Sequence, residues 1–146
     1  MRTVVAKFGG TSVATPERVM NVARRLVERK RAGDKVVAVV SAMGKTTNAL
    51  ERVVEALAAG QEDKALAQWV DIIDFHVAIM KSLGLQPGSD IRLQGEIPYD
   101  PKCSYDENYD QIVSLGEIMS TQIVAVYLLK QGLSVEWWNM PKLLRT

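Results

Sequence analysis

Two apolar runs flank one amphipathic segment near the beginning of the chain, and this order constrains the fold more than any other feature. Thr3 to Phe8 is a short run of β-branched and apolar residues that Gly9 and Gly10 end, and Val36 to Val40 is apolar without a break. An unbroken apolar run is typical of a strand covered on both faces in a parallel sheet. The sequence therefore predicts a strand, a helix and a second, parallel strand.

The segment between the two runs carries the signals of a helix. Thr15 can cap it, Pro16 fits the first helical position, and Glu17 suits the positive end of the helix dipole. The apolar residues at helical spacing are Val19, Val22, Ala23, Leu26 and Val27. We expect this helix to end at Gly33.

Three more helical repeats follow the second apolar run. They consist of Leu50, Val53, Val54 and Leu57; of Leu66, Trp69, Val70, Ile73, Val77 and Met80; and of Ile112, Leu115, Met119, Ile123 and Val126. The first ends at Gly60, the second near Gly84 and the third at Gly132, and we expect the first two helices to pack on the sheet.

Two segments lack this helical repeat. Residues 85–108 contain three prolines and several acidic residues, which indicates a long loop. The segment "LSVEWW", Leu133 to Trp138, predicts another strand. We expect Trp137 and Trp138 to serve in core and interface packing.

Composition excludes several functional classes. The 146 residues, 47% of them hydrophobic, suffice for one domain with a core. The 18 basic and 17 acidic residues form no long single-sign block, so no nucleic-acid or anionic membrane surface is indicated. Lys7 and the glycines interrupt the first apolar run, and no apolar run approaches the roughly 18 residues of a membrane span. We expect a soluble, cytoplasmic protein with a small-molecule partner.

Cysteine and histidine chemistry is also disfavoured. Cys103 is the single cysteine and cannot form an internal disulfide, and the single histidine, His76, lies in a different kind of segment. We expect an incidental loop thiol, an ordinary helical histidine and no protein-held metal.

Gly9 to Ser12 and Ser41 to Asn48 leave the carboxyl ends of the two predicted strands, where open α/β sheets bind ligands. Their glycines, hydroxyls and lysines suit a phosphate or carboxylate cradle. The alternative is that they only form tight turns and helix caps. "GKT" at Gly44 to Thr46 matches the end of a P-loop, but Val39 stands where that motif needs its first glycine.

Three segments resemble one family in the family's own order. "KFGGTSV" at Lys7 to Val13 resembles the signature that opens aspartate kinases of the amino-acid kinase superfamily. "VVSAMGKTTNAL" at Val39 to Leu50 is similar to their second loop, and "SLGEIMST" at Ser114 to Thr121 to their S-x-G-E-x-x-S helix. The resemblance implies a three-layer α/β sandwich with a mostly parallel sheet and flanking helices. Residues 1–146 would form its N-terminal half, the amino-acid-binding lobe.

The resemblance also implies a reaction. Aspartate kinases transfer the γ-phosphoryl of ATP, bound with Mg²⁺ as substrate, to the side-chain carboxylate of L-aspartate. The product, 4-phospho-L-aspartate, begins lysine, threonine and methionine biosynthesis, and no tightly bound cofactor is implied. Because a carboxylate is already ionised at neutral pH, no general base is required, and the site must instead cancel negative charge and align the reactants.

The family's site residues map onto matching positions of this chain. The implied phosphate site consists of Lys7, Phe8, Gly9, Gly10 and Ser41. Lys7 would be the catalytic residue that neutralises the transferred phosphoryl. Thr47 would contact aspartate, and Glu117 would accept a hydrogen bond from its α-ammonium group. The alternatives remain a helix cap for Thr47, a solvated helix residue for Glu117 and an ordinary surface charge for Lys7.

The chain departs from the family pattern near its end. Asn139 and Pro141 stand where the family usually has Asp-x-Arg, and Met1 to Thr146 contain no glycine-rich "TLGRGGSD"-type segment, second nucleotide-binding lobe or regulatory ACT domain. We therefore expect little kinase activity from these residues alone, an exposed strand edge, and association with a completing chain or a homo-oligomer. The alternatives are a half-domain that binds a ligand or a completing chain, and an inactive remnant.

Overall fold

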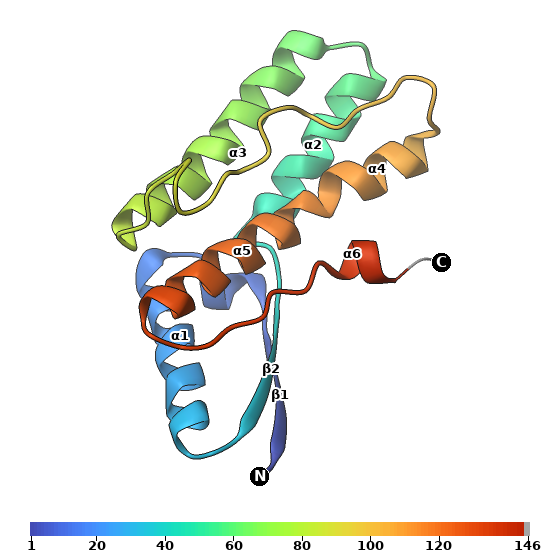
Figure 1. The fold of residues 1–146 in the computed structure, drawn as a ribbon. Helices are drawn as coiled ribbons and strands as arrows, with labels where there is room; N and C mark the ends of the chain where they lie inside the picture. The colour runs from blue at the N-terminus through green and yellow to red at the C-terminus, as the bar shows by residue number, and fades with distance from the viewer. Residues whose placement is uncertain (145–146) are drawn as a thin grey trace.

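The structure is a computed structural model that describes residues 1–144, and a pair of parallel strands lies near its N-terminus (Figure 1). β1 (Thr3–Phe8) pairs in register with β2 (Lys35–Val40), with Lys7 opposite Val39. α1 (Pro16–Arg31) connects them, and a short 3-10 helix, η1 (Gly10–Val13), precedes it. The predicted strand–helix–strand unit is confirmed.

The ends of α1 follow from local chemistry. The Thr15 hydroxyl accepts a hydrogen bond from the Arg18 amide, at 3.3 Å, and Pro16 occupies the first turn. At the other end, Gly33 adopts φ of +86°, a left-handed conformation that glycine reaches without the steric cost of a Cβ. The predicted start and end of this helix are therefore correct.

Only one face of the sheet is covered in the described part of the chain. Ala6, Phe8 and Val36 pack against the core under α1 and α5, whereas Val5 and Val39 on the opposite face are 68% and 47% exposed. The prediction that the second strand is covered on both faces is thus wrong for residues 1–144, because no described element packs there. The expected exposure of apolar surface is confirmed.

The other elements are helices. They are α2 (Thr46–Ala58), α3 (Glu62–Ser82), α4 (Tyr105–Val113), α5 (Leu115–Lys130) and α6 (Met140–Leu143). α2 packs against both α3 and α4, beyond the carboxyl ends of the strands (Figure 1). The prediction that the second and third helices pack on the sheet is wrong, apart from the C-terminal end of α3.

Two apolar clusters form the core. The sheet cluster comprises Val13, Val19, Val22, Ala23, Leu26, Val40, Met43, Ile79, Met80, Leu83, Leu85, Ile91, Ile123, Val124 and Leu128. The helical cluster comprises Leu50, Val53, Val54, Ala56, Ala65, Trp69, Ile72, Ile112, Leu115 and Met119. Because α5 supplies residues to both, it joins the sheet to the helical layer.

Part of the predicted core face of α3 is exposed. Leu66 is 56% and Val70 47% exposed, while Trp69 is buried as expected and Ile72 joins it. The apolar residues of α3 cover two adjacent faces of the helix. The face with Trp69 and Ile72 packs in the helical cluster, whereas the adjacent face with Leu66 and Val70 is exposed.

The segment after α3 is an ordered loop that ends earlier than predicted. Tyr105 to Asn108 form the first turn of α4, where Ser104 and Glu107 make a capping box. The buried Asn108 side chain donates from Nδ2 to the Asp100 backbone carbonyl and accepts at Oδ1 from the Asp100 backbone N–H, both at 2.9 Å. The predicted loop 85–108 therefore closes at Ser104, and these bonds hold its final turn.

The segment "LSVEWW" is not a strand. Leu133 to Trp138 form no ladder with any described strand, and Trp137 and Trp138 are both exposed, Trp138 by 58%. The Trp137 indole N–H donates to the Thr121 hydroxyl at 2.9 Å. Core packing of the two tryptophans is therefore not seen, since no neighbouring strand covers them in residues 1–144.

One helical stretch, Tyr105–Lys130, is long enough to cross a membrane, and one 18-residue window within it is apolar enough by composition. Its residues Ile112, Met119 and Ile123 are buried in the two apolar clusters. A helix that is buried in two apolar clusters also needs apolar residues on most of its surface, so its composition resembles that of a membrane-spanning helix.

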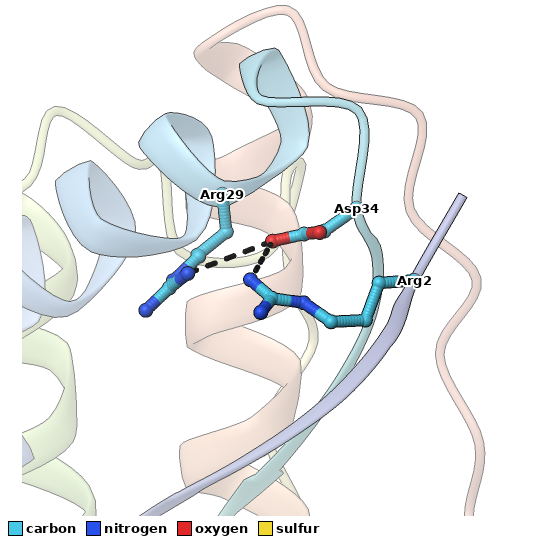
Figure 2. A network of polar contacts seen from close by, with 3 residues as sticks. All are labelled: Arg2, Arg29 and Asp34. Atoms are coloured by element: carbon cyan, nitrogen blue, oxygen red, sulfur yellow. Dashed lines mark hydrogen bonds and ion pairs between the residues drawn. The ribbon is translucent and has the colours of Figure 1, made fainter.

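A charge cluster fixes the end of the sheet that is farthest from the loops (Figure 2). The buried Asp34 carboxylate lies 3.3 Å from the Arg2 guanidinium and 3.7 Å from that of Arg29. The Lys35 amide also donates to the Arg2 carbonyl, at 2.8 Å. These contacts tie the start of β1 to the turn between α1 and β2.

Two glycines allow the layers to approach at the other end. A Cβ on Gly10 would lie 2.8 Å from the Ala42 carbonyl oxygen, and one on Gly116 would lie 2.9 Å from the Ala42 Cβ. Gly10 precedes α1, Ala42 follows β2 and Gly116 begins α5. The loops and α5 can therefore meet only if positions 10 and 116 lack side chains.

We predict that Gly10→Ala lowers the free energy of unfolding by about 1–3 kcal/mol, because the new methyl group collides with backbone. Gly9→Ala is the matched control, since its Cβ meets nothing within 4 Å and its φ of −72° suits any residue. Urea unfolding of both variants measures the difference. Equal stability of the two would contradict the close approach.

A second prediction concerns His76, which is fully buried with Nδ1 2.7 Å from the Ile72 carbonyl oxygen. Burial lowers the pKa of His76 below its ordinary 6.5, and the bond to Ile72 raises it by less. The unfolded chain therefore binds more protons just below pH 6.5, so the free energy of unfolding falls as the pH drops through and below this value, toward the folded pKa. The slope should not exceed about 1.4 kcal/mol per pH unit.

Urea unfolding between pH 5.5 and pH 8 tests this pH dependence against His76→Leu, which keeps an apolar group of similar size and removes the titration. The variant should show a flatter profile than the original chain. Identical slopes would show that His76 does not cause the loss.

Candidate functional site

The two glycine- and hydroxyl-rich loops lie side by side at the carboxyl ends of β1 and β2. The Ser41 amide donates to the Phe8 carbonyl, and the Gly44 amide donates to the Gly10 carbonyl, both at 3.0 Å. Parallel pairing brings both strand ends to the same edge, and these bonds continue the pairing into the loops. The predicted neighbouring loops are therefore present.

The third motif reaches the same place from α5. The Ser120 hydroxyl donates to the Ser41 carbonyl at 2.7 Å. One turn earlier, a Cβ on Gly116 would lie 3.4 Å from the Thr46 side chain at the start of α2. Segments 7–13, 39–50 and 114–121 thus converge through direct contacts, although more than sixty residues separate the last two.

Lys7 and Phe8 lie on opposite faces of β1. Lys7 is exposed on the uncovered face, opposite Val39, whereas Phe8 is half-buried against the sheet cluster. Phe8 can therefore line a site on the Lys7 side only through its backbone, whose carbonyl already bonds to Ser41. Gly9 is exposed and Gly10 half-buried at the turn that follows.

Ser41 and Thr47 are half-buried near the first turn of α2. The cap residue of this helix is Lys45, which makes no side-chain cap bond, and the local hydroxyl bond there is Thr46 to the Met43 carbonyl at 2.6 Å. The helix-cap alternative for Thr47 is therefore not what the structure has. Within residues 1–144 the Thr47 hydroxyl makes no hydrogen bond.

Glu117 is exposed in the first turn of α5, directly after Gly116. In the part of the chain that the structure describes, its carboxylate forms neither a hydrogen bond nor an ion pair, and only its backbone carbonyl accepts from Thr121, at 2.8 Å. The carboxylate is thus open to a cationic group that comes from solution.

The residues that hold the three motifs together were not among the predicted site residues. Gly116, Ser120 and Thr46 make the contacts described above. Gly116 and Ser120 are letters of the S-x-G-E-x-x-S pattern, so the signal was present. Its structural meaning required the three-dimensional contact with Ser41 and Ala42.

Two further observations concern possible metal ligands and the single thiol of the chain. Across residues 1–144, no three histidine, cysteine, aspartate or glutamate side chains come together to hold a metal ion. Partial burial, and then the carboxylates of Asp100 and Glu107, raise the pKa of Cys103 above its ordinary 9.0. The thiol therefore stays protonated and weakly reactive at neutral pH.

Asn139 and Pro141, which stand where the family usually has Asp-x-Arg, lie at the start of α6. Asn139 lies just before α6, and its side-chain oxygen is buried without a hydrogen-bond partner in residues 1–144. Pro141 occupies the first turn of that short helix. Neither residue provides a charge to the site.

Known proteins are similar to this chain in sequence. Aspartokinase 1, chloroplastic, of Arabidopsis thaliana is 33% identical over 145 residues, which cover 94% of this chain and 25% of that protein. An aspartokinase of Bacillus sp. (strain MGA3) is 52% identical over 59 residues, or 40% of this chain and 14% of its own length.

Two solved structures are also similar. E. coli aspartokinase III in complex with aspartate and ADP matches 94% of this chain and 31% of its own, with a TM-score of 0.67 and 21% identity. Aspartate kinase from Synechocystis matches 90% of this chain and 15% of its own, with a TM-score of 0.51 and 27% identity. The first supports the fold alone, and it confirms the α/β class with a parallel sheet and flanking helices.

The chain spans less than a third of the length of each of these proteins. The profile of the Amino acid kinase family, however, matches residues 2–145, which is almost the whole chain. The three converging motifs lie within this match. The chain therefore belongs to the amino acid kinase family.

Proposed function

We propose that this chain forms the amino-acid-binding part of an aspartate kinase, which transfers the γ-phosphoryl of ATP to the side-chain carboxylate of L-aspartate. The convergence of the three motifs, through the Ser41–Phe8, Gly44–Gly10 and Ser120–Ser41 hydrogen bonds, carries this proposal. The similar aspartokinases support the choice of substrate, since one of them was solved with aspartate and ADP.

The reaction needs charge cancellation more than proton transfer. A carboxylate oxygen of aspartate forms a bond to the γ-phosphorus while the bond to the β,γ-bridging oxygen breaks, and ADP leaves with that electron pair. The Lys7 ammonium, exposed at the end of β1, reduces the repulsion between the two anions. The backbone amides of the Gly9–Gly10 turn add donors for the phosphoryl oxygens, with Ser41 beside them.

Two residues in the first turns of α2 and α5 recognise aspartate. The Glu117 carboxylate accepts hydrogen bonds from the α-ammonium group, and the Thr47 hydroxyl donates to a carboxylate of the substrate. Neither side chain has a hydrogen-bond partner within residues 1–144. Contacts between Gly116 and Thr46 place these two turns next to each other. The amino acid therefore lies between the helical layer and the glycine loops.

The second substrate is the Mg²⁺ complex of ATP, and the reaction requires no tightly bound cofactor. Its phosphates bring the ion with them. The product would be 4-phospho-L-aspartate for lysine, threonine and methionine biosynthesis, and we place the enzyme in the cytoplasm.

The uncovered face of the sheet favours a second, related function. Val5, Val37 and Val39 expose an apolar surface next to Lys7, which is the type of surface that a further protein segment covers. Residues 1–146 would then act as a half-domain that a completing segment, a partner chain or a homo-oligomer must finish. Robust kinase activity of these residues alone would contradict this view.

The first test of catalysis is Lys7→Ala in a polypeptide in which the remaining part of the kinase domain follows these residues. We expect kcat for ATP-dependent aspartyl hydroxamate formation to fall at least about 100-fold, because one charge that stabilises the transition state is lost. Lys35→Ala is the matched control: it removes an exposed lysine from the far end of β2 and should change kcat less than about twofold. Full activity of the Lys7 variant would refute the role.

The substrate assignment is tested by Glu117→Gln in the same polypeptide. Loss of a charge-assisted contact to the α-ammonium group should raise the KM for aspartate about 10- to 100-fold and leave the KM for ATP unchanged. Glu55→Gln on the exposed side of α2 serves as control. An unchanged KM for aspartate in the Glu117 variant would remove this residue from the substrate site.

A further inference from the structure

A depression of about 250 Å³ lies between η1 and α1, and Phe8 and Val22 form its apolar lining. Its polar lining consists of Thr11 and Ser12 from η1 and of Arg18, Asn21 and Arg25 from α1. Residues 18, 21 and 25 lie three and four positions apart, so one face of α1 presents them together. Among the described residues, its lining contains two guanidinium groups and no carboxylate.

Internal contacts orient these side chains as donors. Arg18 donates from Nη1 to the Thr11 carbonyl, which holds its guanidinium against η1. Arg24 donates to the Asn21 side-chain oxygen at 2.6 Å, so the Asn21 oxygen is occupied and its NH₂ group remains to donate. Among the ion pairs of residues 1–144, none involves Arg18 or Arg25. Apart from the Arg18 bond to Thr11, the two guanidinium groups and the Asn21 NH₂ have no partner among the described residues.

This depression is separate from the proposed phosphoryl site. Phe8, which lines it, lies on the covered face of β1, whereas Lys7 is on the opposite, uncovered face. The inference that follows does not depend on the proposed kinase activity, because it concerns the other side of the strand.

We propose that this depression binds one oxyanion, a phosphate group or a carboxylate. Arg25 and the free nitrogens of Arg18 neutralise the charge, and guanidinium groups match the geometry of both anions. The Asn21 NH₂ and the Thr11 and Ser12 hydroxyls complete the donor set. The bound anion bridges η1 and α1 and so links the loop that carries Gly9 and Gly10 to the helix behind it.

The test is a titration of the ¹⁵N-labelled 146-residue chain with inorganic phosphate, followed by NMR at an ionic strength held constant with sodium chloride. We expect saturable shifts of the Thr11 and Ser12 amides and of the Asn21 side-chain NH₂. Succinate in a parallel titration distinguishes the sources: tighter binding of phosphate indicates a phosphate-bearing ligand, and tighter binding of succinate a carboxylate.

Arg25→Gln should weaken this binding about tenfold, because it removes a charge-assisted contact. Arg25 is exposed, so the substitution leaves the core intact. Arg52→Gln, which removes an exposed arginine of α2 outside the depression, should bind as the original chain does. Lys7→Ala should also leave the Asn21 shift unchanged, which separates this site from the proposed phosphoryl site.

Three results would overturn the proposal. They are the absence of saturable shifts with both anions, equal affinity of the Arg25 variant and the original chain, and loss of the Asn21 shift in the Lys7 variant. Failure of the kinase proposal alone would change none of these readouts.

Discussion

The rest of the structure depends on the approach of three backbone segments at one edge of the sheet. Gly10 and Gly116 leave no room for a Cβ against Ala42, and only there can the loop after β1, the loop after β2 and the start of α5 come together. The Ser120–Ser41 hydrogen bond then fixes α5 to the second loop. Because α5 also supplies residues to both apolar clusters, the same helix holds the site and the core.

The two faces of β1 have different roles in this arrangement. The covered face carries Phe8 into the core, next to the arginines of α1, while the exposed face carries Lys7 beside uncovered valines. Alternation along the strand therefore separates two positively charged regions that lie within a few residues in sequence.

Local signals in the sequence predicted most of the first half of the fold. β1, α1 with its Thr15 cap, and β2 follow from residue type and spacing over a few positions, so they were found at close to their observed bounds. The ordered motifs likewise indicated three segments that the structure brings into contact. These predictions succeed because the determining interactions are local or because they form a specific pattern.

Predictions failed where distant partners decide the structure. The valines of β2 have the composition of a strand covered on both faces. Within residues 1–144, however, no element packs on the face that carries Val37 and Val39. "LSVEWW" has strand composition and no neighbouring strand among the described elements, and α3 has two apolar faces of which only one meets α2. The close contact of Gly116 with Ala42 could not be inferred from spacing, since seventy-odd residues separate them.

A crystal structure of the completed kinase domain with aspartate and a non-hydrolysable ATP analogue would show directly whether the three motifs bind the substrate. We expect the α-ammonium group of aspartate to lie within hydrogen-bonding distance of the Glu117 carboxylate. We also expect the side-chain carboxylate to point to the terminal phosphate beside Lys7 and the Gly9–Gly10 turn. Aspartate bound elsewhere, with Lys7 and Glu117 both in solvent, would contradict the proposal that the three converging motifs form the substrate site.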